Sequence, residues 1–147
     1  MRIYMDVCCL NRPFDDLSQV KVYLEAEAVL AILSRCEHDD WTLLTSSVID
    51  YELSKMTDLE RLEQVTALCL VSDEHVFMSY EDENRAADFQ QSGIKPIDSF
   101  HLAVAEANNI DAFLTTDKQL INAGSRLNLK LKIANPVSWF MEVVNNE

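Results

Sequence analysis

The chain of 147 residues has little glycine and proline, two and three residues respectively, and it carries no long hydrophobic run. Hydrophobic residues make up 48% of the composition, so the chain is not of the disordered or low-complexity class. No stretch approaches the roughly 20 apolar residues that span a bilayer, and the N-terminus shows no secretory signal pattern. We therefore expect one soluble, cytoplasmic domain over residues 1–147, without an internal linker.

Cysteine is also scarce. Cys8, Cys9, Cys36 and Cys69 include no C-x-x-C pair, and adjacent cysteines rarely suit a zinc site. We expect all four to be reduced and mostly buried thiols.

Basic residues are few, with 12 Lys and Arg against 25 Asp and Glu, which gives a net charge of −13. This balance disfavours non-specific nucleic-acid binding, because that affinity comes largely from Lys and Arg on phosphates. Two explanations for the acidity stay open. The carboxylates form a solvated acidic surface, or some of them gather where a divalent cation reverses the local sign of the charge.

Short apolar segments alternate with helical patterns along the chain. Strands are expected at 2–7, 41–47, 74–78, 111–116 and 129–134, and helices at 16–37, 47–56, 58–70, 80–92, 97–109, 116–120 and 137–144. Such alternation favours parallel pairing. It predicts a three-layer α/β/α domain around a central, mainly parallel sheet.

Several residues mark the expected helix ends. Ser46 or Ser47 is a candidate N-cap for the helix that follows the second strand. Gly93 is expected to end the helix over 80–92, and Thr116 and Gln119 have the spacing of a capping box.

Four acidic residues lie at or near the carboxyl ends of strands, where open α/β sheets bind ligands. Asp6 ends the first strand, Asp117 follows the strand over 111–116, and Glu52 lies in the helix after the second strand. Asp98 lies in the first turn of the helix that Pro96 opens. Each one alone has an ordinary explanation as a cap, a turn former or a solvated residue. Asp6 fits this explanation least, because its neighbours on both sides are apolar.

Together, four carboxylates at one sheet edge would repel one another unless a cation lay between them. Oxygen ligands without a neighbouring His/Cys cluster favour Mg²⁺ or Mn²⁺ over zinc. The pattern therefore predicts a site for a hard divalent cation at this edge of the sheet.

The segments "IYMDVCCLNRP", "TSSVIDYEL", "KPIDSFHLAVAEANNIDAFLTTDKQL" and "IANP" resemble the successive motifs of PIN-domain ribonucleases. That family includes VapC-like toxin components of bacterial toxin–antitoxin pairs. The resemblance covers nearly the whole chain and implies a PIN-like fold. Carried over to this sequence, it implies catalytic and metal-binding carboxylates at Asp6, Glu52, Asp98 and Asp117, and substrate contacts at Asn11 and Thr116. One position departs from the pattern, since Val7 stands where many members have Ser or Thr.

The resemblance further implies an endoribonuclease that hydrolyses RNA phosphodiester bonds with Mg²⁺ or Mn²⁺. It implies an antitoxin partner and a homodimer. Local positive charge for RNA is expected from basic residues near the edge: Arg12, Lys55, Lys95 and Lys118.

Two other classes remain open, namely a receiver-like phosphoryl-transfer domain and a catalytically silent interaction module on the same fold. His101 lies three residues beyond Asp98, on or near the same helix face. It is either a partner of Asp98 or of a phosphate, or a partly buried, hydrogen-bonded helix residue.

Overall fold

A five-stranded sheet forms the centre of the computed structural model, which describes residues 1–38 and 40–147. The strand order is β3-β2-β1-β4-β5, and all four strand pairings are parallel. The strands are β1 (Arg2–Met5), β2 (Thr42–Ser46), β3 (Glu74–Val76), β4 (Ala112–Leu114) and β5 (Lys132–Ala134). The expected parallel sheet is confirmed, and the last strand lies at one edge of it.

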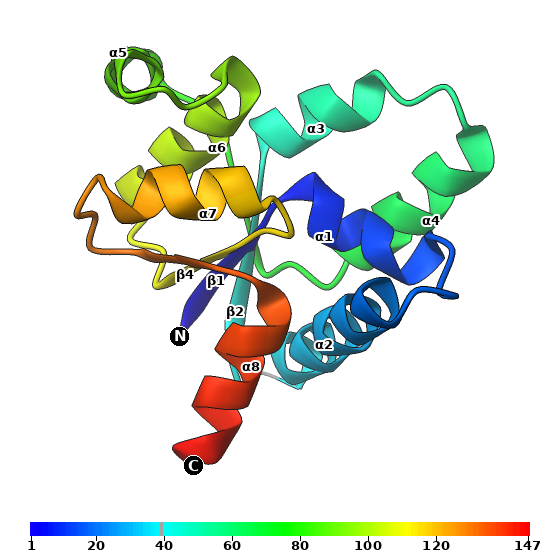
Figure 1. Ribbon diagram of the computed structural model, residues 1–147. Coiled ribbons are helices and arrows are strands. Elements are labelled where there is room, and N and C mark those ends of the chain that lie inside the picture. The colour runs from blue at the N-terminus through cyan, green and yellow to red at the C-terminus, as the bar shows by residue number, and fades with distance from the viewer. Residues whose placement is uncertain (39) are drawn as a thin grey trace.

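Helices cover both sides of this sheet (Figure 1). Helices α2 (Val20–Glu37) and α8 (Pro136–Asn145) pack against each other on one side, and α6 (Pro96–Ala107) and α7 (Lys118–Ser125) lie on the other. The remaining elements are α1 (Val7–Asn11), the 3-10 turn η1 (Arg12–Phe14), α3 (Ser47–Ser54), α4 (Leu59–Cys69) and α5 (Tyr80–Gln91). The three-layer α/β/α architecture is confirmed. Within residues 1–38 and 40–147, no helix combines the length and apolar character needed to cross a membrane.

The apolar stripe of α2 faces the core. Ala26, Val29 and Leu33 are buried, and Val22 is half-buried. The helix begins at Val20 and not at residue 16, because the Asp16 carboxylate accepts a hydrogen bond from the Ser18 backbone N–H (3.0 Å) and favours a turn there.

The first strand ends two residues earlier than predicted. The carbonyl of Asp6 accepts a hydrogen bond from the Cys9 N–H (2.9 Å), so α1 starts directly after β1. The Asp6 N–H still donates to the Leu114 carbonyl (2.9 Å), which extends the ladder with β4 by one hydrogen bond. Asp6 therefore belongs to the junction between a central strand and a helix, and this position fixes its backbone on both sides.

The core lies between the sheet and the helices. Tyr4 and Phe113, from neighbouring strands, are fully buried and stack with ring centroids 5.4 Å apart. All four cysteines are free; Cys9 and Cys36 are buried, whereas Cys8 and Cys69 are half-buried.

Candidate active site

Asp6 is a buried carboxylate, with 6% of its surface exposed, at the carboxyl end of β1. Its Oδ2 accepts a hydrogen bond from the hydroxyl of Thr115 (2.9 Å), directly after β4. A buried charge needs such partners. The neighbouring strand thus supplies the hydroxyl that holds this carboxylate.

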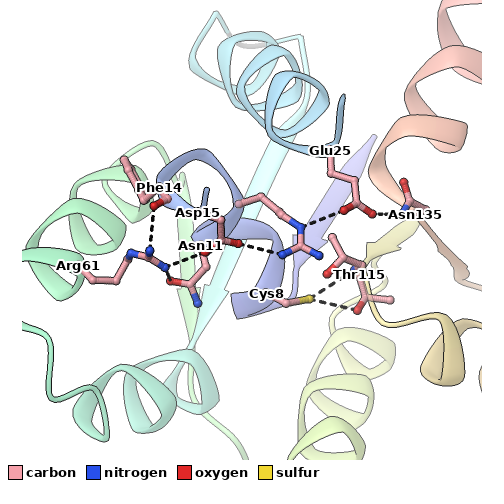
Figure 2. Close-up of polar contacts among 10 residues, drawn as sticks. Cys8, Asn11, Phe14, Asp15, Glu25, Arg61, Thr115 and Asn135 are labelled. Atoms are coloured by element: carbon pink, nitrogen blue, oxygen red, sulfur yellow. Dashed lines mark hydrogen bonds and ion pairs between the residues drawn. The ribbon is translucent and has the colours of Figure 1, made fainter. Parts of the chain in front are cut away.

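Thr115 is fully buried and contacts two further groups. Its Oγ1 accepts a hydrogen bond from the backbone N–H of Asp117 (3.1 Å) and lies 3.4 Å from the Cys8 sulfur (Figure 2). The family resemblance of the sequence predicted Thr116 as a substrate contact. In the structure the backbone N–H of Thr116 contacts the Cys8 sulfur (3.4 Å). Because β4 ends at Leu114, Thr115 and not Thr116 carries the hydroxyl that faces Asp6.

Helix α3 brings Glu52 to the same place. Ser46 starts this helix as its N-cap, as predicted, by accepting from the Ile49 N–H (3.3 Å). Glu52 accepts a hydrogen bond on Oε1 from Nε2 of His101, and the same Nε2 lies 4.0 Å from Oδ1 of Asp6. Ligand atoms of Asp6, Glu52 and His101 all lie within 4.8 Å of one another.

His101 is fully buried and not partly buried as one of the two interpretations had it. Its Nδ1 lies 2.6 Å from the Tyr4 hydroxyl, which in turn lies 2.6 Å from the Ser46 hydroxyl. Burial, the largest effect, raises the pKa of Tyr4 well above its usual value, so its hydroxyl keeps its proton. The partner of His101 is Glu52, from a helix 49 residues away, and not Asp98; no local spacing in the sequence could show this pairing.

Asp98 lies just outside this tight group, half-buried in the first turn of α6. Burial raises the pKa of Asp98 to about 6, and the charges of Asp6, Asp117 and Glu52 act in the same direction. The contribution of these three charges indicates that the three carboxylates lie near Asp98. Asp98 and Asp117 also line one small cavity of about 50 Å³, together with Lys95.

Asp117 serves first as a helix cap. Its Oδ1 accepts hydrogen bonds from the backbone N–H groups of Gln119 (2.9 Å) and Leu120 (3.2 Å) at the start of α7. The capping box predicted for Thr116 and Gln119 is therefore wrong, because α7 starts one residue later, at Lys118, and Asp117 is its N-cap. The other carboxylate oxygen of Asp117 takes no part in the cap.

The donor set suits a hard divalent cation. Carboxylate oxygens dominate it, and the charges of three of these carboxylates add to the effect of burial in raising the pKa of Asp98. A single imidazole is present, but its Nε2 already faces a carboxylate. The residues therefore fit Mg²⁺ or Mn²⁺ better than zinc.

Arg12 is not a free cation at this edge. Its Nε donates to Glu25 (2.9 Å) and its Nη1 donates to Asp15 (2.9 Å), so its charge is paired within the fold. Glu25 is almost fully buried and also accepts from the Asn135 amide (2.6 Å), as Figure 2 shows. The side chain of Asn135, in the closing "IANP" segment, thus contacts α2 and not the carboxylate cluster.

Asn11 joins the same network. Arg61 of α4 donates to Oδ1 of Asn11 (3.3 Å), to Asp15 (3.0 Å) and to the Phe14 carbonyl (2.8 Å) (Figure 2). No sequence pattern pointed to Arg61, because its partners lie about 50 residues away. This network ties α1 and η1 to α4.

Known proteins were compared with the chain. A search of curated proteins found no match. Among solved structures, the crystal structure of VapBC2 from Rickettsia felis, bound to a DNA fragment from their promoter, shares the fold with a TM-score of 0.59. The two are 17% identical, and the alignment covers 92% of this chain and 98% of that chain. The PIN domain family model matches residues 15–125, which is well over half of the length, and the chain belongs to the PIN domain family.

Proposed function

We propose that the protein is a metal-dependent endoribonuclease and the toxin of a toxin–antitoxin pair. The observation that supports this most is the gathering of Asp6, Glu52, Asp98 and Asp117, from four separate elements, at one end of a parallel sheet. Burial, together with the neighbouring negative charges, raises the pKa of Asp98 to about 6, and a protein tolerates such a cost in stability at a functional site.

The site residues have separate tasks in this proposal. Bound Mg²⁺ or Mn²⁺ would supply Lewis-acid stabilisation of the phosphate and lower the pKa of an attacking water. Asp6, held by Thr115, and Glu52, held by His101, present carboxylate oxygens in fixed directions. Asp98 and Asp117 complete the oxygen ligand set around the neighbouring small cavity.

The RNA would reach this acidic site with help from the few cations near it. Lys95 lines the cavity beside Asp98, and Lys118 is exposed in the first turn of α7. Lys55 is exposed directly after the C-terminal end of α3, and its Nζ lies 5.1 Å from the centroid of the Tyr51 ring. These lysines are our candidates for the phosphate contacts. We also propose that two polar residues, Asn11 and Thr116, contact the substrate.

Two protein partners belong to the proposal. The solved relative is a VapBC2 complex, and by analogy an antitoxin would cover the carboxylate site of this chain.

A second copy would bind through an aromatic surface at which Tyr51, Phe77 and Tyr80 are 57%, 74% and 76% exposed. This surface also has an apolar hollow of about 270 Å³, lined by residues that include Val48, Met78, Ile97 and Phe100. Projecting rings and a hollow on one face suit a twofold dimer. Four free thiols suit the reducing cytoplasm.

Incubation of the purified protein with mixed RNA tests the activity. Cleavage is expected with Mg²⁺ or Mn²⁺ and not with EDTA. Glu52→Gln should lose at least about 100-fold in rate, or about 2.7 kcal/mol of transition-state stabilisation. Glu63→Gln, which changes an exposed carboxylate of α4, is the matched control. Cleavage that persists in EDTA would refute the metal-dependent mechanism.

Growth assays test the toxin assignment. Expression of the wild type should halt growth, the Glu52→Gln form should not, and a small protein encoded beside it should restore growth. The family assignment removes the receiver-like alternative. A protein that binds Mn²⁺ yet leaves RNA and growth unaffected would instead be the silent interaction module.

A further inference from the structure

A buried chain of polar side chains leads from the core to the carboxylate cluster. Ser46, Tyr4 and His101 are each fully buried, and adjacent members are joined by contacts of 2.6 Å. The chain ends at Glu52, whose side chain is 28% exposed. It joins β2, β1, α6 and α3, the elements around the site.

For an ionised Glu52 and a neutral imidazole, the hydrogen bonds of this chain run in one direction. A carboxylate only accepts hydrogen bonds, so Nε2 of His101 must carry the proton that Glu52 receives. In the neutral imidazole Nδ1 is then an acceptor, and the Tyr4 hydroxyl donates to it. The Tyr4 oxygen accepts in turn from the hydroxyl of Ser46. Every proton in the chain has an acceptor, and the direction runs toward Glu52.

We infer that Tyr4 and His101 are positioning residues, which fix the tautomer of the imidazole and thereby the orientation of the Glu52 carboxylate toward the metal. The inference rests on the proposed function. It assigns His101 to Glu52 and not to the metal, although its Nε2 lies 4.0 Å from Asp6. The nitrogen that faces the cluster carries a proton in this arrangement, and a protonated nitrogen has no lone pair for a cation.

Tyr4→Phe tests the arrangement with the smallest structural change. It removes one hydroxyl and keeps the ring that stacks on Phe113. Loss of a partner in this position typically weakens metal binding 10- to 100-fold. We expect Mn²⁺ affinity, measured by calorimetry, to fall about 10-fold and kcat to fall with KM unchanged. Tyr23→Phe, an exposed tyrosine of α2, is the matched control.

Substitutions of His101 separate positioning from ligation. The amide of His101→Gln still donates a hydrogen bond to Glu52, whereas His101→Leu cannot. Mn²⁺ affinity should fall 10- to 100-fold in His101→Leu and recover at least tenfold of this loss in His101→Gln. Electron spin echo spectra of the Mn²⁺-loaded wild type should show no coupling to an imidazole nitrogen. If His101→Leu does not fold, Tyr4→Phe and the spectrum decide.

Two results would overturn the inference. A nitrogen coupling would make His101 a metal ligand. Unchanged Mn²⁺ affinity and kcat in Tyr4→Phe would show that Tyr4 does not position the imidazole of His101. Either result leaves the nuclease intact if the wild type still cleaves RNA only with metal. Cleavage in EDTA would instead refute the proposed function, whatever the Tyr4 variant does.

Discussion

Asp98→Asn is predicted to stabilise the metal-free protein at neutral pH. Burial and the charges of Asp6 and Asp117 raise the pKa of Asp98 from 3.8 to about 6, which corresponds to about 3 kcal/mol at most. Partial exposure and screening reduce this to about 1–2 kcal/mol. The substitution also loses a favourable charge in the first turn of α6, worth about 0.5 kcal/mol. The net gain is about 1 kcal/mol, or roughly 3 °C in Tm.

The pH dependence has a definite sign. The folded state binds the Asp98 proton more tightly than the unfolded state, so this group favours folding below pH 3.8. Its contribution is lost as the pH rises from 3.8 through about 6, and it is constant above that range. The advantage of Asp98→Asn should therefore be absent near pH 3.8 and fully present near pH 7.5.

Urea unfolding in EDTA at several pH values measures this difference. Glu63→Gln serves as the control, because it also removes one negative charge but from an exposed position on α4. A variant that is less stable than the wild type at pH 7.5, or a difference that does not change with pH, would show that Asp98 is not crowded by its neighbours.

The other predictions concern the metal, the reaction and the supporting network. Mg²⁺ or Mn²⁺ at 100 times its Kd should stabilise the wild type by about 2.7 kcal/mol, and an equal gain in the Asp6→Asn, Asp98→Asn double variant would place the ion elsewhere. Asp6→Asn and Asp117→Asn should each slow RNA cleavage at least about 100-fold, and their effects should not add, since either one removes the same metal. Arg12→Met should destabilise the fold by about 3 kcal/mol in urea unfolding, because it leaves Glu25 buried with its charge unpaired; a loss below about 1 kcal/mol would mean that Glu25 is protonated or solvated.

The sequence predicted the fold well because its strands and helices follow local rules. Alternation of apolar runs and helical stripes gave the parallel sheet, and Ser46 gave the start of α3. Errors arose where two signals overlapped within a few residues. Asp6 continues the ladder of β1 and also starts α1, and Thr116 has capping spacing although Asp117 makes the cap.

Long-range partners account for what the sequence could not reveal at the site. The hydroxyl that contacts Asp6 belongs to Thr115, 109 residues away, and this contact arises only from the pairing of β1 with β4. Glu52 and His101 meet because α3 and α6 pack together. Arg12 is of a residue type that often contacts phosphates, yet here its guanidinium forms an ion pair with the buried Glu25. In each case the missing information was the partner and not the residue.

The position of β1 in the middle of the sheet has a consequence for synthesis of the protein on the ribosome. Asp6 is made first, but its neighbouring strand β4 and the carboxylate Asp117 emerge only after more than a hundred further residues. A nascent chain that stops short of β4 can pair β1 with β2, but it lacks the second strand beside β1, the Thr115 hydroxyl that holds Asp6, and Asp117. An interrupted translation product therefore carries an incomplete site, and the complete chain gains Thr115 and Asp117 together when β4 pairs with β1.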